Sequence, residues 1–156
     1  MSDLHPIQMF FSSHHPLASK VNASFEGSVG GKVLIEIEAL DSFIRDEKTR
    51  ILHSGFATII LDSIMGGAVM GMLTKVQPIA TIGLSMHHLR KPVAGEHISG
   101  HAHCTAIYND VAYVTGELHD QNGEAIAIAN GTFMIGTRGT SIREKASNDH
   151  KVGSRI

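Results

Sequence analysis

The sequence predicts an α+β domain in which a curved antiparallel sheet wraps around one long central helix. Three observations lead to this fold class. A hairpin pattern covers residues 23–40, a single long helical segment covers residues 54–74, and strand patterns joined by short turns fill the chain from there to residue 136. Strands gathered around one helix, without regular alternation of the two, are typical of α+β domains with antiparallel pairing.

The hairpin is predicted from a glycine pair and from the alternation that follows it. Gly30 and Gly31 supply the two residues of a tight turn. After the turn, three apolar residues share one face of a strand: Val33, Ile35 and Ile37. Residues 41–50 are polar and charged, and a loop is predicted there.

The segment 54–74 has apolar residues on all sides of the helical wheel. A helix that is apolar all round is a buried helix, so it needs more cover than one flat sheet face provides. A curled sheet would provide this cover, and the sheet could also continue across a dimer. Three glycines in the segment have poor helix propensity and suit close approach of other backbone or of a ligand: Gly66, Gly67 and Gly71.

Four strands are predicted after the helix, at residues 78–90, 97–108, 111–119 and 125–136. The stretch "DQNGE" at residues 120–124 is a hairpin turn between the last two. A short helix is predicted over residues 14–22. The chain is therefore divided into an N-terminal arm (1–13), a folded domain (14–137) and a polar tail expected to be disordered (138–156).

Composition excludes several classes of function. The net charge of −2 gives no electrostatic argument for binding nucleic acid or an anionic membrane. With Cys104 as its one cysteine, the chain has no internal disulfide and no cysteine-based zinc site. The N-terminus lacks a signal-peptide pattern, and Asp62 with its neighbouring glycines weakens the segment 54–74 as a membrane span. A cytoplasmic protein is expected.

Asp62 is the first candidate for chemistry, because it lies within the apolar run "ILHSGFATIILDSIMGG". Burying an ionised carboxylate without a partner is very costly. The side chain is therefore hydrogen-bonded, protonated or facing a cleft. A catalytic acid and a structural acid paired with a loop backbone, Lys or Arg remain equally open from the residues alone.

The helix start is the second candidate. If the helix begins at "HSG", residues 53–55, its first backbone N–H groups are free and form an anion site together with the helix dipole. Acyl transfer needs such donors where its oxyanion develops. Ser54 and Asp62 are about two turns apart, roughly 11 Å along the helix. One helix could not bring both to a single carbonyl, so a site shared across a dimer is favoured.

Histidines in the strands raise the possibility of a metal site. His101 and His103 share one face of a strand, and His87 and His88 are close in a neighbouring strand. A zinc or nickel site would require three or four ligands with carboxylate support, and no acid is spaced to complete the set. The alternation favours polar residues on the outer face of the sheet, so no metal and no cofactor is predicted.

Three motifs resemble those of a known family. They are "LHSGFATIILDSIMGGAV", with an acid nine residues after the histidine, "IGLSMHHLRKPVAGEHISGHAH", and "GELHDQNGEAIAIANGTFMIG". Together they resemble hot-dog-fold acyl-CoA thioesterases, and most closely the phenylacetic-acid-degradation subfamily, over residues 14–137. The resemblance implies hydrolysis of a CoA or carrier-protein thioester by a homodimer or a dimer of dimers.

The resemblance also implies roles at the helix. Asp62 falls where the family has its catalytic acid, which acts on the thioester as general base or nucleophile. Ser54 falls on the middle position of a His-Gly-Gly motif, whose backbone N–H polarises the thioester carbonyl, and Gly55 matches the second glycine. His53 matches the motif histidine, which shapes the loop and the helix start.

Other positions are implied to bind substrate or water. Thr81 falls near a Ser or Thr that orients the hydrolytic water, and His87 and His88 lie where some relatives place a histidine in the acyl pocket. Arg90 and Lys91 are candidates for contacts with the CoA phosphates.

One position departs from the family pattern. Many relatives have Asn or Gln six residues before the motif histidine, whereas this chain has Glu47, which cannot donate a hydrogen bond unless protonated. This departure, together with Ser54, leaves open an alternative function: a non-catalytic acyl-CoA-binding or regulatory module of the same fold. A hydratase of related fold is the third reading, but its His-Asp constellation is not found.

Overall fold

The computed structural model describes residues 21–75 and 77–136. The predicted arm (1–13) and the predicted tail (138–156) lie outside the described residues, as does most of the helix predicted over 14–22. That prediction is wrong at its end, because the first strand begins at Asn22.

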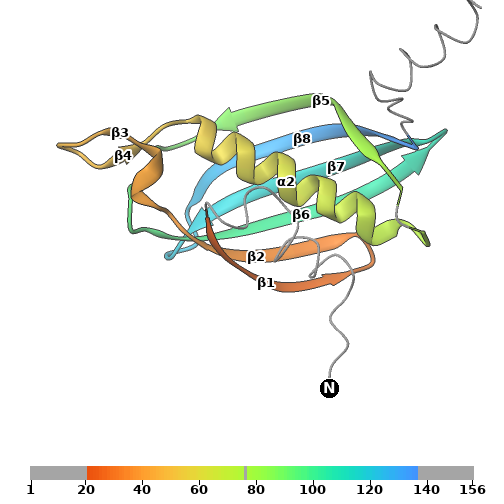
Figure 1. Cartoon of the computed structure of the whole chain (residues 1–156), viewed down its shortest axis with the longest axis horizontal. Helices are drawn as coiled ribbons and strands as arrows, with labels where there is room; N and C mark the ends of the chain where they lie inside the picture. The colour runs from red at the N-terminus through yellow and green to blue at the C-terminus, as the bar shows by residue number, and fades with distance from the viewer. Residues whose placement is uncertain (1–20, 76, 137–156) are drawn as a thin grey trace, which may run out of the picture.

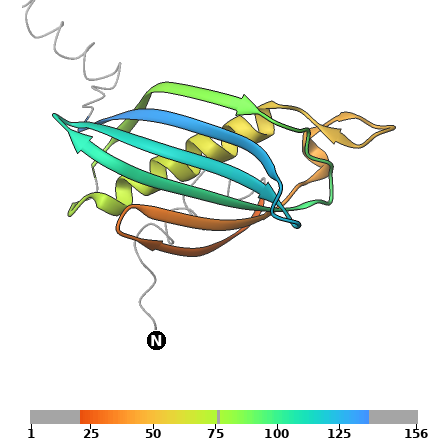
Figure 2. The same cartoon turned by 180° about the vertical axis from the view of Figure 1, so that it is seen from behind.

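Six strands of the described chain form one antiparallel sheet in the order β1-β2-β6-β7-β8-β5. Their bounds are β1 Asn22–Val29, β2 Lys32–Glu38, β5 Ile79–His88, β6 His97–Tyr108, β7 Val111–Asp120 and β8 Ala125–Ile135. The helix α2, Gly55–Met72, lies across the concave face and contacts all six strands (Figure 1). Figure 2 shows the outer face of the same sheet in front, with α2 behind it. The predicted fold class is confirmed.

Tight turns join the hairpins where the sequence predicts them. Gly30 and Gly31 have positive φ angles of 57° and 73° between β1 and β2. Asn109 and Asp110 have positive φ angles of 48° and 62° between β6 and β7. Two consecutive residues with positive φ form the type of turn whose twist suits a two-residue hairpin loop.

The predicted loop over residues 41–50 is wrong in part, because it contains a small hairpin. A 3₁₀ turn, Asp41–Phe43, precedes β3 (Ile44–Asp46) and β4 (Ile51–Leu52), which pair with each other. Asp46 Oδ1 accepts the backbone N–H of Lys48 at 2.9 Å, and this bond is the main reason why the pKa of the Asp46 carboxyl is lowered. With three and two residues, the strands are too short to show a period of two, so the alternation could not reveal them.

The sheet covers one side of α2 and leaves the other partly exposed. The buried side carries the largest core residues of the helix: Phe56, Ile60, Leu61, Ile64, Met65 and Val69. On the other side Ile59 is 38% exposed, and Asp62 and Ser63 are half-buried. The expectation of burial all round is therefore wrong for this stripe within the described residues. By length and composition α2 could also span a membrane, but half of it is buried inside the domain.

Glycines on three neighbouring strands let α2 lie close to the sheet. A Cβ atom added at Gly116 of β7 would lie 2.9 Å from Met65 Cγ. One added at Gly131 of β8 would lie 2.7 Å from Met65 Cε. At Gly100 of β6 the added atom would lie 3.2 Å from Ile64 Cδ1. The contact is most restrictive at Gly116, where an added side chain would overlap both Met65 and Leu61 of the helix, whereas at Gly131 it would meet the flexible end of Met65.

Replacing Gly116 by alanine is expected to lower the free energy of unfolding by about 1–3 kcal/mol, because the added methyl overpacks Met65 and Leu61. Gly66→Ala in α2 is the matched control. Its added Cβ would lie 3.4 Å from Ile79 Cδ1, an ordinary contact. Alanine also improves helix propensity by about 1 kcal/mol, so this variant should be as stable as the native chain or more stable. Urea denaturation measures both, and equal destabilisation of the two variants would contradict the explanation.

Candidate functional site

Asp62 lies on the partly exposed side of α2 and faces the edge strand β5. Its Oδ1 atom accepts a hydrogen bond from Thr81 Oγ1 at 2.8 Å. In the described part of the chain, no Lys or Arg forms an ion pair with Asp62. The carboxylate is therefore hydrogen-bonded and open on one side, and the structure brings together two residues that the sequence analysis singled out separately.

Thr81 reaches Asp62 because β5 contains a β-bulge. Thr81 pairs with the buried Phe133, which places it on the helix side of the sheet. Gly83 pairs with Thr132 on the outer face, and Ile82 is the extra residue between them. In a regular strand, positions 81 and 83 would face the same side. The bulge changes this alternation and turns the Thr81 hydroxyl toward the helix, a use of bulges that is common next to functional sites.

The start of α2 is organised by His53. The backbone N–H of Gly55 donates to His53 Nδ1 at 3.0 Å, and the N–H of Phe56 donates to the His53 carbonyl oxygen at 3.0 Å. Ser54 occupies the N-cap position, but it already has helical dihedrals (φ −59°, ψ −28°) and its side chain makes no capping bond. The histidine, and not the serine, therefore satisfies the first donors of the helix.

The amides predicted as oxyanion donors differ in availability. A Cβ atom at Gly55 would lie 3.1 Å from His53 Nδ1, so glycine suits this position. The Gly55 N–H is bonded to His53, whereas no described residue accepts the Ser54 N–H. These amides and Asp62 are separated by about two helical turns, roughly 11 Å. Within one chain the two groups do not meet at a single point.

Three candidate residues outside the helix are exposed: Glu47, His87 and His88. Glu47 lies in the turn between β3 and β4 and forms no ion pair within the described residues. His87 and His88 lie at the end of β5, and successive residues of a strand face opposite sides. His87 pairs with Ile128 on the outer face, so His88 alone lies on the helix side. The roles of these residues stay predictions.

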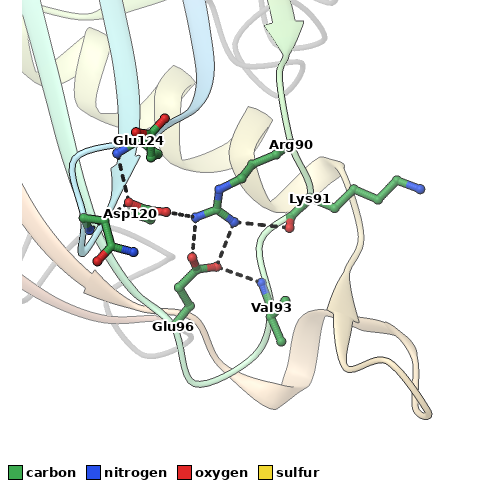
Figure 3. Close-up of polar contacts among 7 residues, drawn as sticks. Arg90, Lys91, Val93, Glu96, Asp120 and Glu124 are labelled. Carbon is green, nitrogen blue, oxygen red and sulfur yellow. Dashed lines mark hydrogen bonds and ion pairs between the residues drawn. The ribbon is translucent and has the colours of Figure 1, made fainter.

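Arg90 lies at the centre of an ion cluster that no pattern in the sequence predicts (Figure 3). Its guanidinium donates to both carboxylate oxygens of Glu96 and to Asp120 Oδ2, the latter at 2.7 Å. The side chains of Arg90, Glu96 and Asp120 are 31%, 16% and 9% exposed. The hydrogen bond to Glu96 is the main reason why the pKa of Arg90 is raised. Lys91 points away from the cluster (Figure 3).

Asp120 is fixed by the β7–β8 turn as well as by Arg90. Its Oδ1 atom accepts the backbone N–H groups of Glu124 and Asn122 at 2.9 and 2.8 Å. These bonds, with that from Glu124 the largest contribution, and the bond from Arg90 lower the pKa of the Asp120 carboxyl. The local signal was present in "DQNGE", which predicted the turn, but nothing local pointed to a partner thirty residues earlier.

The histidines of β6 face outward, as the alternation predicts. His101 packs edge-to-face on His119 with ring centroids 5.6 Å apart, and His97 Nε2 lies 2.9 Å from Glu36 Oε2. Among the described residues, no group of three or more His, Cys, Asp or Glu is arranged to hold a metal ion. Cys104 is buried, and burial raises the pKa of its thiol.

Comparison with known proteins agrees with this fold. The family described as the acyl-CoA thioesterase C-terminal domain matches residues 3–135. No curated protein matches the chain significantly. Among solved structures, the E. coli PaaI protein from the phenylacetic acid degradation operon is similar with a TM-score of 0.71 and 12% identity, over 80% of this chain and 87% of that chain.

Two further structures are similar in the same way. A phenylacetic acid degradation-related protein of Ralstonia eutropha JMP134 gives a TM-score of 0.70 and 22% identity, over 83% of this chain and 99% of that one. A hypothetical thioesterase protein of Streptococcus pneumoniae TIGR4, solved with coenzyme A, gives a TM-score of 0.67 and 18% identity, over 76% of this chain and 89% of that one. These likenesses show the hot-dog fold. Because the family match spans most of the sequence, the chain belongs to the acyl-CoA thioesterase family of thioester hydrolases.

Proposed function

We propose that the protein hydrolyses an acyl-CoA thioester, adding water across the C–S bond to release a free acid and the CoA thiol. The observation that carries this proposal is the Asp62–Thr81 hydrogen bond on the partly exposed side of α2. Thr81 donates to Oδ1, which leaves Oδ2 of the half-buried carboxylate available to water or to a carbonyl carbon. Such an arrangement serves either general-base catalysis or direct attack, and both routes remain open.

The helix start would supply the oxyanion donors of this reaction. The Ser54 N–H has no acceptor among the described residues, and it belongs to an exposed residue at the N-terminus of α2. A donor placed in this way stabilises charge that develops on a thioester oxygen. The Gly55 N–H could join it once its bond to His53 Nδ1 is exchanged for one to the oxyanion. His53 then acts by holding the loop and the helix start.

A dimer would complete the site. β5 is an edge strand of the described sheet, and Ile82 and the nearby Leu89 are 55% and 56% exposed. An exposed edge with apolar residues is a surface for pairing with another strand. Two-fold pairing through β5 would bring the Asp62 of one copy, which faces β5, toward the helix start of the other. The roughly 11 Å between Asp62 and the amides within one chain then separates two sites, not two parts of one site.

Relatives support CoA as the carrier of the acyl group. The Streptococcus pneumoniae protein is solved with coenzyme A, and a Streptococcus mutans protein is bound to acetyl CoA. The former has also been solved with an aspartate, and separately a threonine, replaced by alanine. Asp62 and Thr81 are the residues of this chain that we assign to such a pair.

The alternative is an acyl-CoA-binding module without turnover. It is favoured by the Gly55 amide, which is engaged by His53, and by Glu47, which cannot donate a hydrogen bond when ionised. Purified protein should be assayed with a panel of acyl-CoAs while thiol release is followed with a chromogenic disulfide. Thiol release supports the proposed reaction, whereas binding of acyl-CoA without thiol release favours the module.

Asp62→Asn should lower turnover by at least about 100-fold, because the amide can neither accept a proton from water nor attack the thioester. The fold should survive, since the amide retains an oxygen that accepts the hydrogen bond from Thr81. Steady-state thiol release gives the rate, and circular dichroism with thermal unfolding verifies the fold. An Asp62→Asn protein with native turnover would remove Asp62 from the mechanism.

Thr81→Val should lower kcat by about tenfold with little change in KM, because Asp62 loses the hydrogen bond that orients its carboxylate. Ser63→Ala is the matched control. The Ser63 hydroxyl is adjacent to Asp62 in sequence but donates to the Ile59 carbonyl of its own helix at 2.7 Å. Comparable losses of kcat in both variants would mean that the Thr81 hydroxyl has no particular role.

A site shared by two copies predicts complementation between two inactive variants. Ser54→Pro removes one N–H, and its φ of −59° already suits proline. Co-expression with Asp62→Asn should give mixed dimers in which one site is intact and the other carries both changes. With random mixing about half of the dimers are mixed, and each mixed dimer has one intact site of two, so about a quarter of native activity should return. No recovery in purified mixed dimers, isolated with two affinity tags, would place both groups of a site in one chain.

A further inference from the structure

The loop after β5, residues 89–96, is held to the sheet by the Arg90 cluster. Arg90 donates its backbone N–H to the Ile126 carbonyl of β8 at 3.2 Å, and its side chain joins Glu96 to Asp120 (Figure 3). Glu96 Oε2 also accepts the backbone N–H of Val93 at 3.0 Å. Both ends of the loop are therefore tied, through one guanidinium, to the turn between β7 and β8.

The same loop supports β4, the short strand immediately before the helix. The Leu52 N–H donates to the Pro92 carbonyl at 3.0 Å, and the Ala94 N–H donates to the Arg50 carbonyl at 2.9 Å. Ile51 and Val93 form an antiparallel bridge between the two segments. In the described structure, β4 is thus held on one side by β3 and also by this loop.

β4 leads directly into the candidate oxyanion donors. Ser54 follows Leu52 by two residues, with His53 between them, and the His53 N–H donates to the Phe43 carbonyl at 2.8 Å. A shift of β4 would move the Ser54 amide relative to a bound thioester. Displacements of about 1 Å at such donors can reduce a rate by about 100-fold.

We propose that Arg90 is a positioning residue for catalysis: it holds the 89–96 loop, and through β4 it fixes the Ser54 amide. This inference rests on the proposed function and adds to it the part of the fold that sets the oxyanion geometry. Charge argues against direct phosphate binding by Arg90. Two carboxylates outweigh one guanidinium in this cluster, so a CoA phosphate would approach a net negative group.

The kinetic experiment compares two thioesters with the same acyl group. One is the most active acyl-CoA of the panel, and the other carries its acyl group on N-acetylcysteamine, which has no phosphate. Arg90→Met should lower kcat about 10–100-fold on both, with similar KM values for acyl-CoA. Arg90→Lys should recover only part of kcat, because an ammonium cannot reproduce the fork that joins two carboxylates. A raised KM for acyl-CoA alone, with native kcat, would overturn the proposal in favour of phosphate binding.

Hydrogen exchange tests the structural step without any substrate. In Arg90→Met the amides of Leu52 and Ala94 should exchange at least about tenfold faster, the scale set by loss of a charge-assisted hydrogen bond. Asp41→Asn is the control, since it breaks the exposed Arg50–Asp41 ion pair near the same hairpin and should change neither exchange nor kcat. Unchanged exchange in Arg90→Met would overturn the proposal whether or not the protein proves to be a thioesterase.

Discussion

The close approach of α2 to the sheet, which Gly100, Gly116 and Gly131 permit, decides which side of the helix can carry chemistry. With Leu61 and Met65 pressed against the strands, the core fills that side completely. The next residue along the helix is turned by about 100°, so Asp62 leaves the core and faces β5. One position earlier, the same carboxylate would be buried against apolar side chains, at a large cost in free energy. The apolar helix thus tolerates an acid at position 62 because this position faces the edge strand of the sheet, where the side chain is only half-buried.

Separate parts of the fold fix the two halves of the proposed site. The carboxylate depends on β5, whose bulge at Ile82 turns Thr81 toward it. The amides at the helix start depend on β4, which rests on the loop that Arg90 holds. The carboxylate and the amides belong to one rigid helix, which fixes the distance between them and keeps them apart. In the proposed dimer, accurate assembly of the site would depend on how the two copies pair, and a small displacement of either support would affect one half of the site alone.

The elements with strong periodicity could be predicted from sequence, and the contacts between distant segments could not. Alternation at Val33, Ile35 and Ile37 and the long apolar helix are local patterns, and both appear in the structure. The β3–β4 hairpin has too few residues for a period to emerge. The partnership of Arg90 with Asp120 joins segments thirty residues apart and has no local signature. The bonding of the first helix donors by His53 and not by the Ser54 side chain depends on backbone dihedrals at Ser54 that composition does not reveal.

The hydrogen bond from Gly55 to His53 gives the proposed mechanism a way to favour the transition state. A neutral thioester carbonyl is a weak acceptor and would not readily displace the imidazole nitrogen from the Gly55 N–H. An oxyanion accepts charge-assisted hydrogen bonds that are about twice as strong as neutral ones. The exchange of partners would therefore become favourable only as negative charge develops on the oxygen. Interactions that strengthen in this way raise kcat, whereas those already made with the substrate mainly lower KM. On this view the Ser54 amide binds the ground state and the Gly55 amide acts when the carbonyl is attacked.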